Sequence, residues 1–511
     1  MEDMPKRFFL FLQVGKSVAH LGYTDISKSR MADTLKDKTA KGLLWGGLNT
    51  FLQQLLNLVF GIFLARKLSQ DDYGMVGMLA VFTGIAASLQ DGGFVSALNK
   101  RKNITFDDYN SVFWFNVTVA FVCYWILFFC APLIADFYGE PELVWLSRYC
   151  FLGFFITSLN IAPRAYLFRN LKAKENSTLG LVALIVSGIV GIVMAANGFA
   201  YWGLATQSNV FVLVITIMSY YYSGFRPKLT FSFQPIREMF GFGSKLVVTS
   251  ICNVVNNNLF SVILGKFYTS ADVGNFTQAN KWNNLGHSTI TNMLYGVAQP
   301  VFTKVDDERG RQKRVFRKLL RFTALLAFPA MFGLSLTANE LIVITITEKW
   351  LTSASILSLL CIWGAFIPIN SLLSNLIISR GRSGTYMWCT IGLIVVSLAT
   401  VLVMAYLKSG MWNMLVAFVI VNILWMFVWH YFAKREIGIS LFEMLRDMAP
   451  YALLSMAVCA GAFFAFSGIS NVYLAFVLKF FSVAIVYCTI LWLSGSVIFK
   501  ECVAYFFRKK R

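Results

Sequence analysis

Long apolar segments constrain this chain more than any other feature. A helix needs about twenty apolar residues to cross the hydrocarbon core of a bilayer. Only 14% of the residues are charged, against about 25% in soluble domains, which leaves too little polar surface for a water-soluble globule. We therefore predict an all-α integral membrane protein of about fourteen transmembrane helices, near residues 43–65, 75–97, 111–135, 143–163, 178–196, 199–222, 241–264, 275–302, 320–338, 353–379, 385–407, 411–432, 450–467 and 472–498.

The positions of lysine and arginine predict how these helices are oriented. Basic residues accumulate on the cytoplasmic side of membrane proteins. With the N-terminus placed inside, the cytoplasmic segments carry 37 of the 45 lysines and arginines. The external connections carry Arg66, Lys67, Lys266, Lys349 and Lys408. Both termini are therefore predicted to be cytoplasmic, and topology explains the net charge of +20 without nucleic acid binding.

Residues 1–42 are predicted to form a cytoplasmic N-terminal arm. The apolar run from Phe8 to Val14 is too short for a signal peptide of the usual form, and no cleavage site follows it. Met31 opens a polar, basic stretch directly before the first apolar segment. Residues 1–30 are then either a misassigned start or an arm on the membrane surface, and we favour the misassigned start.

An internal repeat divides the rest of the chain. Residues 57–74 resemble residues 257–274 at a shift of 200, and residues 150–169 resemble residues 361–380 at a shift of 211. One copy holds six predicted helices, so both copies have the same orientation, as in transporters built from parallel repeats. We predict an N-terminal six-helix lobe over 43–240, a C-terminal six-helix lobe over 241–440, and two extra helices with a basic cytoplasmic tail over 441–511.

Several motifs also give the chain a recognisable resemblance. They are LQDGGFVSALNKRKNIT (89–105), SVFWFN (111–116), APLIA (131–135), FYGEPEL (137–143) and PRAYL (163–167), with residues 242–246 and 265–274 in the second half. Over roughly residues 35–440 the sequence resembles Wzx/WzxC-type polysaccharide flippases, which handle O-antigen, capsule and exopolysaccharide units. These belong to the multidrug/oligosaccharidyl-lipid/polysaccharide (MOP) exporter superfamily.

The resemblance implies both a fold and a function. It implies a V-shaped, MATE-like pair of lobes that moves undecaprenyl-pyrophosphate-linked oligosaccharide from the cytoplasmic to the periplasmic leaflet of the bacterial inner membrane, for lipopolysaccharide or exopolysaccharide synthesis. The implied partners are this substrate, membrane lipids, and the polymerase and export machinery of the pathway. A lipid II flippase or a cation-coupled multidrug antiporter of the same superfamily is the alternative. Phe260 departs from the family pattern, because many members carry an acid there.

Amide side chains inside the predicted helices are candidates for the substrate-binding cavity. A sugar crossing the bilayer must replace its water, because an unpaired hydroxyl costs roughly 2–7 kcal/mol on transfer. Amides at helical spacing share a face. The alternative is that they hold helices together at about 0.6 kcal/mol each. The candidates are Gln53 and Asn57, their repeat equivalents Asn253 and Asn257, and Asn280, Asn284 and His287 in the eighth segment.

Ionisable residues within spans are functional candidates because insertion of each costs about 2.5–3.5 kcal/mol. Arg148 and Lys281 lie near the predicted external ends of their helices and could form a cationic site for pyrophosphate, or could reach the headgroups by snorkelling. Asp91 is the candidate for a coupling ion, or it marks a helix end. Lys479 lies outside the lobes, where snorkelling is the simpler interpretation.

The sequence contains no catalytic constellation. Its three histidines have no partner at metal-ligand spacing, and its nine cysteines form no CxxC motif. We therefore predict no enzyme activity, no metal and no cofactor. A membrane polysaccharide polymerase, the alternative from another class, is disfavoured because the predicted external loops are too short to hold an active site.

Overall fold

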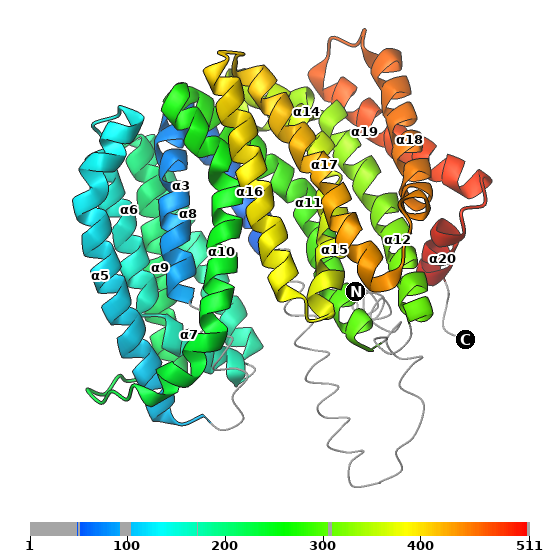
Figure 1. Cartoon of the computed structure of the whole chain (residues 1–511). Helices are drawn as coiled ribbons and strands as arrows, with labels where there is room; N and C mark the ends of the chain where they lie inside the picture. The colour runs from blue at the N-terminus through cyan, green and yellow to red at the C-terminus, as the bar shows by residue number, and fades with distance from the viewer. Residues whose placement is uncertain (1–48, 50–51, 92–103, 171, 305–308, 508–511) are drawn as a thin grey trace.

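The computed structural model describes residue 49 and residues 52–91, 104–170, 172–304 and 309–507. These residues form helices joined by short connections (Figure 1). The predicted arm over 1–42 lies outside the described residues. A first helix over 52–67 is followed by α3 (Gln70–Asp91), α5 (Phe106–Tyr138), α6 (Leu143–Ser158), α7 (Ile161–Arg169), α8 (Ala173–Ala196), α9 (Tyr201–Ser223), α10 (Gln234–Phe267), α11 (Ser270–Lys304), α12 (Arg309–Leu336), α13 (Ala338–Ile346), η2 (Glu348–Trp350), α14 (Leu351–Gly364), α15 (Ile367–Ser379), α16 (Ser383–Tyr406), α17 (Met411–Ile437), α18 (Leu441–Phe466), α19 (Val472–Leu493) and α20 (Val497–Phe507).

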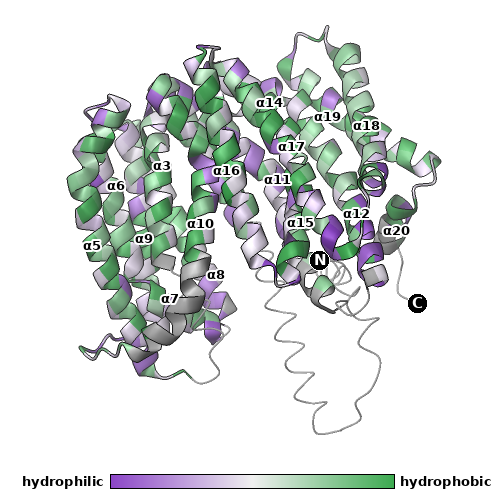
Figure 2. Ribbon diagram, viewed as in Figure 1, coloured by the Kyte–Doolittle hydropathy of each residue, from purple (hydrophilic) through white to green (hydrophobic). Residues whose placement is uncertain are grey.

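The predicted all-helical membrane fold is confirmed. Among the described residues, eleven helices are long and apolar enough to span a membrane, and α6 with α7, bent by 43°, would make a twelfth. Hydrophobic residues run along the outer helices such as α5 and α16 (Figure 2). Two further predicted segments coincide with the first helix and with α11, which is not among these spans. The number fourteen stays a prediction.

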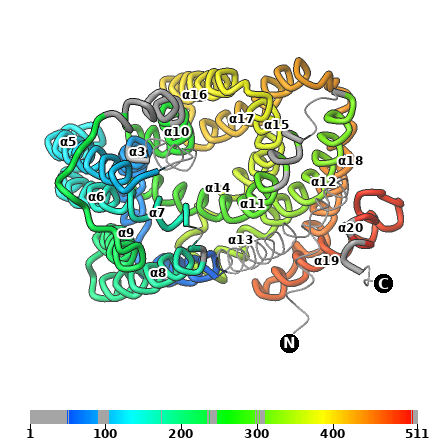
Figure 3. The backbone as a smooth tube through the Cα atoms, turned by 90° about the horizontal axis from the view of Figure 1, so that it is seen from below, coloured from blue at the N-terminus to red at the C-terminus, as the bar shows by residue number. Residues whose placement is uncertain are grey.

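The helices form two groups, one on each side of α3 and α10 (Figures 1 and 3). In one group α8 packs on α9, and α6 packs on α5 and α9; in the other, α11 packs on α14 and α15, and α16 packs on α17. We call the first group, from the first helix to α9 and including α3, the N-lobe. We call the second group, from α10 onward, the C-lobe. They meet where α3 packs against α10 and α11. The predicted domain boundaries are untested and stay predictions.

The connection between the lobes is fixed to the N-lobe. The fully buried side chain of Asn110, in the first turns of α5, donates to the carbonyl oxygens of Lys228 and Thr230 and accepts from the Lys228 amide. Trp114, one turn further on, also donates to the Lys228 carbonyl at 2.7 Å. Segment 224–233, which joins α9 to α10, is therefore held against α5.

The extra helix α18 is tied to the C-lobe by ion pairs. Asp447 is 6% exposed and accepts from Arg317 at 2.6 Å and from Arg321 at 2.8 Å, both on α12. Glu443, which completes the capping box of α18 with Ser440, also pairs with Lys313 of α12 at 2.7 Å. These contacts make α18 a fixed part of the C-lobe.

A second ion pair joins α19 to α13. Lys479 is 7% exposed, and its ammonium donates to the carboxylate of Glu340. The prediction that Lys479 reaches the headgroups by snorkelling is therefore wrong. The chain satisfies this lysine with a carboxylate from a neighbouring helix, a partner that sequence spacing did not reveal.

Breaking this pair on one side should destabilise the protein strongly. Lys479→Met leaves Glu340 buried without its cation, and such losses cost about 3–5 kcal/mol. Thermal unfolding in detergent, followed by loss of the monodisperse peak, should show a clearly lower midpoint for Lys479→Met. The double variant Lys479→Met/Glu340→Gln should recover most of it, because neither partner then leaves a buried charge. Equal midpoints for the wild type and the single variant would contradict this role.

Candidate functional site

At the upper end of Figure 1 the two lobes are held together by a set of polar contacts that we call the clamp. Arg66 of the N-lobe donates to the carbonyl oxygens of Ile344 and Thr345 in the C-lobe, at 2.8 and 2.6 Å. In return Lys349 donates to the carbonyl oxygens of Arg66 and Leu68, at 2.9 and 2.7 Å. The lobes are thus cross-linked in both directions at this end.

A buried tryptophan packs next to these contacts. Trp350 is fully buried, donates from its indole nitrogen to the Ala65 carbonyl at 2.9 Å, and meets the Tyr73 ring edge-on with centroids 5.4 Å apart. Aromatic pairs in this geometry contribute about 0.5–1.5 kcal/mol beyond their buried area. The clamp therefore has an apolar core as well as exposed hydrogen bonds.

A related contact occurs on the other side of the lobe interface. Lys266, which follows Arg66 by 200 residues, ends α10 and donates to the Phe137 carbonyl of the N-lobe at 2.7 Å. A cation at the end of the first helix of each lobe therefore reaches a backbone carbonyl of the opposite lobe.

Two glycines allow α3 and α11 to touch within the clamp. A Cβ on Gly74 would overlap the carbonyl oxygen of Ser270, and a Cβ on Gly274 would overlap the carbonyl oxygen of Gln70. Both contacts are related by the shift of 200 residues. Glycine lets a backbone approach this closely because it lacks a side chain.

The side of α11 that faces the N-lobe continues beyond the clamp as an exposed polar surface. At about 100° per residue, Thr277, which lies against Gly77, shares a face with Lys281. Along this face and away from the clamp, the side chains remain at least partly exposed. We call this set the α11 stripe: Lys281, Asn284, Ser288, Asn292 and Tyr295. A lipid-facing surface would be apolar, so the stripe is not typical of a face turned to the membrane.

Asn57 also faces away from the membrane. The exposed apolar residues of the first helix share one side, and Asn57 lies on the opposite side at about 160° from their mean direction. These apolar residues are Leu52, Leu55, Val59 and Phe63. Asn57 is itself exposed. An exposed amide opposite a lipid-facing side is turned away from the membrane.

Asn257 on α10 has the same arrangement. It is exposed and lies about 150° around the helix from the apolar residues Val255, Leu259 and Val262. Those three line a groove on the outer face of the lobe interface. Asn57 and Asn257, which the repeat relates, thus both point away from the apolar side of their helix.

Lys281 is the basic residue of the α11 stripe. Its Nζ lies 2.5 Å from the position that a Cβ on Gly61 would occupy, so the glycine makes room for it beside the first helix. Among the described residues it has no carboxylate within ion-pair distance, and its side chain is exposed. A lysine on the α11 stripe without a carboxylate partner can pair with an anion.

The remaining predicted amides make contacts within a lobe. Gln53 donates to Asn49 at 3.1 Å and lies against Gly180 of α8. Asn253 donates to the Tyr386 hydroxyl of α16 at 3.3 Å. His287 is 8% exposed, and its Nε2 lies 3.1 Å from the Asn284 amide oxygen, so the buried imidazole holds the Asn284 side chain in place. Asn280 is half-buried.

Arg148 and Lys281 are not brought together. The Arg148 guanidinium stacks on Phe128 of α5, 4.2 Å from the ring centroid, and on the exposed ring of Trp145 at 4.9 Å. Helix α3 packs against both α6, which carries Arg148, and α11, which carries Lys281. Asp91 is the last residue of α3, and its side chain lies outside the described residues.

The structure adds Asn292 and Tyr295 to the candidate set. Both are exposed on the α11 stripe, Tyr295 at 45%. Their spacing from Lys281, eleven and fourteen residues, puts them on its face of the helix. This periodicity was visible in the sequence, but the segment's many other polar residues hid it.

Phe260, where the sequence departs from the pattern that the resemblance implies, packs into an aromatic cluster. It is 1% exposed, with Phe276 and Phe418 at centroid distances of 4.9 and 5.1 Å. The surroundings of this side chain are therefore apolar.

Comparisons with known proteins agree with this architecture. The chain is 26% identical over 359 residues to the lipopolysaccharide biosynthesis protein WzxC of Escherichia coli K12, covering 68% of this chain and 71% of WzxC. It is 24% identical to the succinoglycan biosynthesis transport protein ExoT of Rhizobium meliloti, covering 68% and 70%. It is 22% identical to the teichuronic acid biosynthesis protein TuaB of Bacillus subtilis, covering 67% and 71%.

Solved structures share the fold. The lipid II flippase MurJ in an inward closed conformation superposes with a TM-score of 0.73 at 15% identity, over 90% of this chain and 99% of MurJ. An inward-facing multidrug transporter of the MATE family superposes with a TM-score of 0.62 at 17% identity, over 76% and 94%. A sequence profile described as "Polysaccharide biosynthesis protein" matches residues 63–355, more than half of the chain. The chain therefore belongs to the polysaccharide biosynthesis protein family.

Proposed function

We propose that this protein is a flippase for lipid-linked oligosaccharides. In this proposal the headgroup, a pyrophosphate carrying sugars, enters the space between the lobes while its undecaprenyl chain stays in the membrane. The lobes then exchange the end at which they touch, and the headgroup is released on the other side. The names of WzxC, ExoT and TuaB support polysaccharide synthesis as the pathway.

The α11 stripe carries this proposal. Sugar hydroxyls leaving water need hydrogen-bond partners, and Asn284, Asn292, Tyr295 and the flanking Asn57 offer both donors and acceptors. The Lys281 ammonium would bind the pyrophosphate as a point charge. A drug-binding cavity would favour apolar and aromatic walls, whereas this stripe is mainly amide and hydroxyl.

The clamp supports alternating access. By the distribution of basic residues, the clamped end carries the connections predicted to be external, including Arg66, Lys266 and Lys349. The conformation would then be closed outside and open to the cytoplasm, ready to load substrate. Transport to the periplasm requires the clamp to open and the opposite ends of the lobes to close.

The membrane potential would assist this direction of transport. An inside-negative potential contributes about 2.3 kcal/mol per charge per 100 mV to moving an anion outward. Lys281 would offset part of this gain while it is bound to the pyrophosphate. Asp91 remains the candidate for a coupling ion.

Deletion of the gene tests the proposed function directly. A flippase mutant should accumulate complete lipid-linked units that face the cytoplasm, and these should become accessible to an external glycan-oxidising reagent only after the membrane is permeabilised. Loss of a polymerase would leave single units exposed outside. Loss of an antiporter would change neither the amount nor the location of the lipid-linked units. Either of those patterns would contradict the proposal.

A further inference from the structure

Two junctions between the lobes, as the described residues show them, are chemically different. On one side the first helix meets α11 and α13; on the other, α10 meets α3 and α5. Each junction encloses a pocket, and a shift of 200 residues relates much of their lining. The related pairs are Val81 and Lys281, Phe82 and Trp282, Ile85 and Leu285, and Ile62 and Val262.

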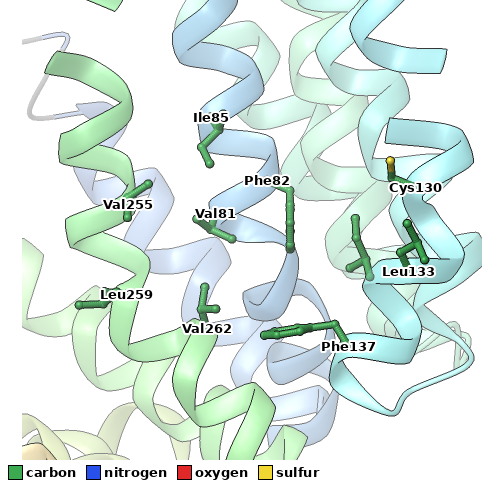
Figure 4. A pocket seen from close by; sticks show the side chains of 10 residues that line it. Val81, Phe82, Ile85, Cys130, Leu133, Phe137, Val255, Leu259 and Val262 are labelled. Carbon is green, nitrogen blue, oxygen red and sulfur yellow. The ribbon is translucent and has the colours of Figure 1, made fainter. Parts of the chain in front are cut away.

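These equivalent junctions differ in charge and in size. The pocket beside Lys281 holds only about 10 Å³ and has Ile346 of α13 in its wall. That is barely the space of one water molecule. The pocket at α3, α5 and α10 holds about 430 Å³, and Val81 occupies the place of the lysine (Figure 4). We call this larger pocket the junction groove.

The junction groove is apolar and opens to the membrane. Aliphatic and aromatic side chains, with Cys130, line it (Figure 4). Leu133 and Phe137 on its rim are 67% and 41% exposed. At its back α3 and α10 touch directly, because Gly84 leaves room for Val254.

We propose that the junction groove binds the isoprenoid chain of the transported lipid. This rests on the proposed function, because a headgroup held at the α11 stripe must be joined to a chain lying in the membrane. The chain has to leave between the lobes, at one of two junctions. The junction beside Lys281 is filled, whereas the junction groove is open and apolar.

Tethering gives the substrate's own chain an advantage over the surrounding phospholipid. Once the headgroup is bound, its chain meets the groove as an intramolecular event with a high effective concentration. The groove also lies on both lobes, with α3 and α5 on one and α10 on the other. Opening of the clamp would part its back wall, so a bound chain could follow its headgroup.

Photolabelling tests this assignment. The full-length protein in phospholipid vesicles is labelled with a polyprenyl pyrophosphate that carries a benzophenone in its chain. Segments 130–137 and 255–262 should be labelled at least about tenfold more than α19, and unlabelled polyprenyl pyrophosphate should suppress this. Leu133→Asn should reduce both labelling and flipping, whereas Phe129→Asn, 70% exposed on the same helix but outside the groove, should not.

The outcomes separate this inference from the proposed function. Even labelling of α5 and α19, or suppression by phospholipid alone, overturns the groove assignment. So does wild-type flipping by a folded Leu133→Asn protein. If the wild type fails to flip any lipid-linked oligosaccharide, the proposed function fails instead, whichever segment is labelled.

Discussion

Replacing Lys281 with glutamine is expected to lower the flipping rate of a pyrophosphate-linked oligosaccharide about tenfold or more. A hydrogen bond to a charged group contributes about 1.5–3 kcal/mol, and each 1.4 kcal/mol corresponds to about a factor of ten. Glutamine keeps much of the side chain's length and its ability to donate but removes the charge. The protein should still insert and fold, because Lys281 has no ion-pair partner among the described residues.

Arg148→Gln is the matched control. It removes one cation from another membrane helix, but Arg148 contacts Phe128 and Trp145 and does not join the α11 stripe. Rates should be measured in vesicles with purified lipid-linked oligosaccharide. A Lys281→Gln protein that flips at the wild-type rate, or an Arg148→Gln protein that is equally impaired, would remove Lys281 from its proposed role.

A single methyl group at Gly274 is expected to block the transport cycle. Gly274→Ala puts a Cβ onto the Gln70 carbonyl oxygen, and α3 and α11 must move apart. Overpacking of this kind costs about 1–3 kcal/mol, which would shift the lobes away from the clamped conformation about fivefold or more. Spin labels at Glu140 and Lys408, on connections of different lobes, should then report a longer distance.

Gly296→Ala on the same helix provides the comparison. A Cβ there meets no atom within 4 Å, and alanine favours a helix over glycine by about 1 kcal/mol. This variant should flip substrate and clamp like the wild type. If Gly274→Ala leaves the label distance and the flipping rate unchanged, closure at Gly274 is not part of the cycle.

Composition and periodicity were enough to predict the helical membrane fold. Each span depends on its own residues, because the bilayer imposes the same length and apolarity on every crossing. Within the internal repeat, Asp72 matches Asp272 and Gly74 matches Gly274, and the members of each pair make equivalent contacts in the structure. The Asp72 carboxylate accepts from the backbone amide of Ser69, and the Asp272 carboxylate accepts in the same way from that of Thr269. Both glycines lie where α3 and α11 touch.

The site could be predicted only in part because helical spacing gives a face but not its neighbour. Asn57 and Gln53 are one turn apart, yet Asn57 is exposed while Gln53 lies against α8. Arg148 and Lys281 looked alike by depth, but an aromatic pair holds the first and a glycine makes room for the second. Such differences come from tertiary contacts, which one sequence does not record.

Movement of a lipid-linked oligosaccharide from one leaflet to the other by this protein can be measured in vesicles. The most direct test uses vesicles containing the purified protein and a polyprenyl-pyrophosphate oligosaccharide labelled on its sugar, with quencher added outside. We expect the protected fraction to fall with time in vesicles with the wild type and to fall much more slowly with Gly274→Ala. Protection that persists as in protein-free vesicles, with correctly folded wild-type protein present, would contradict it.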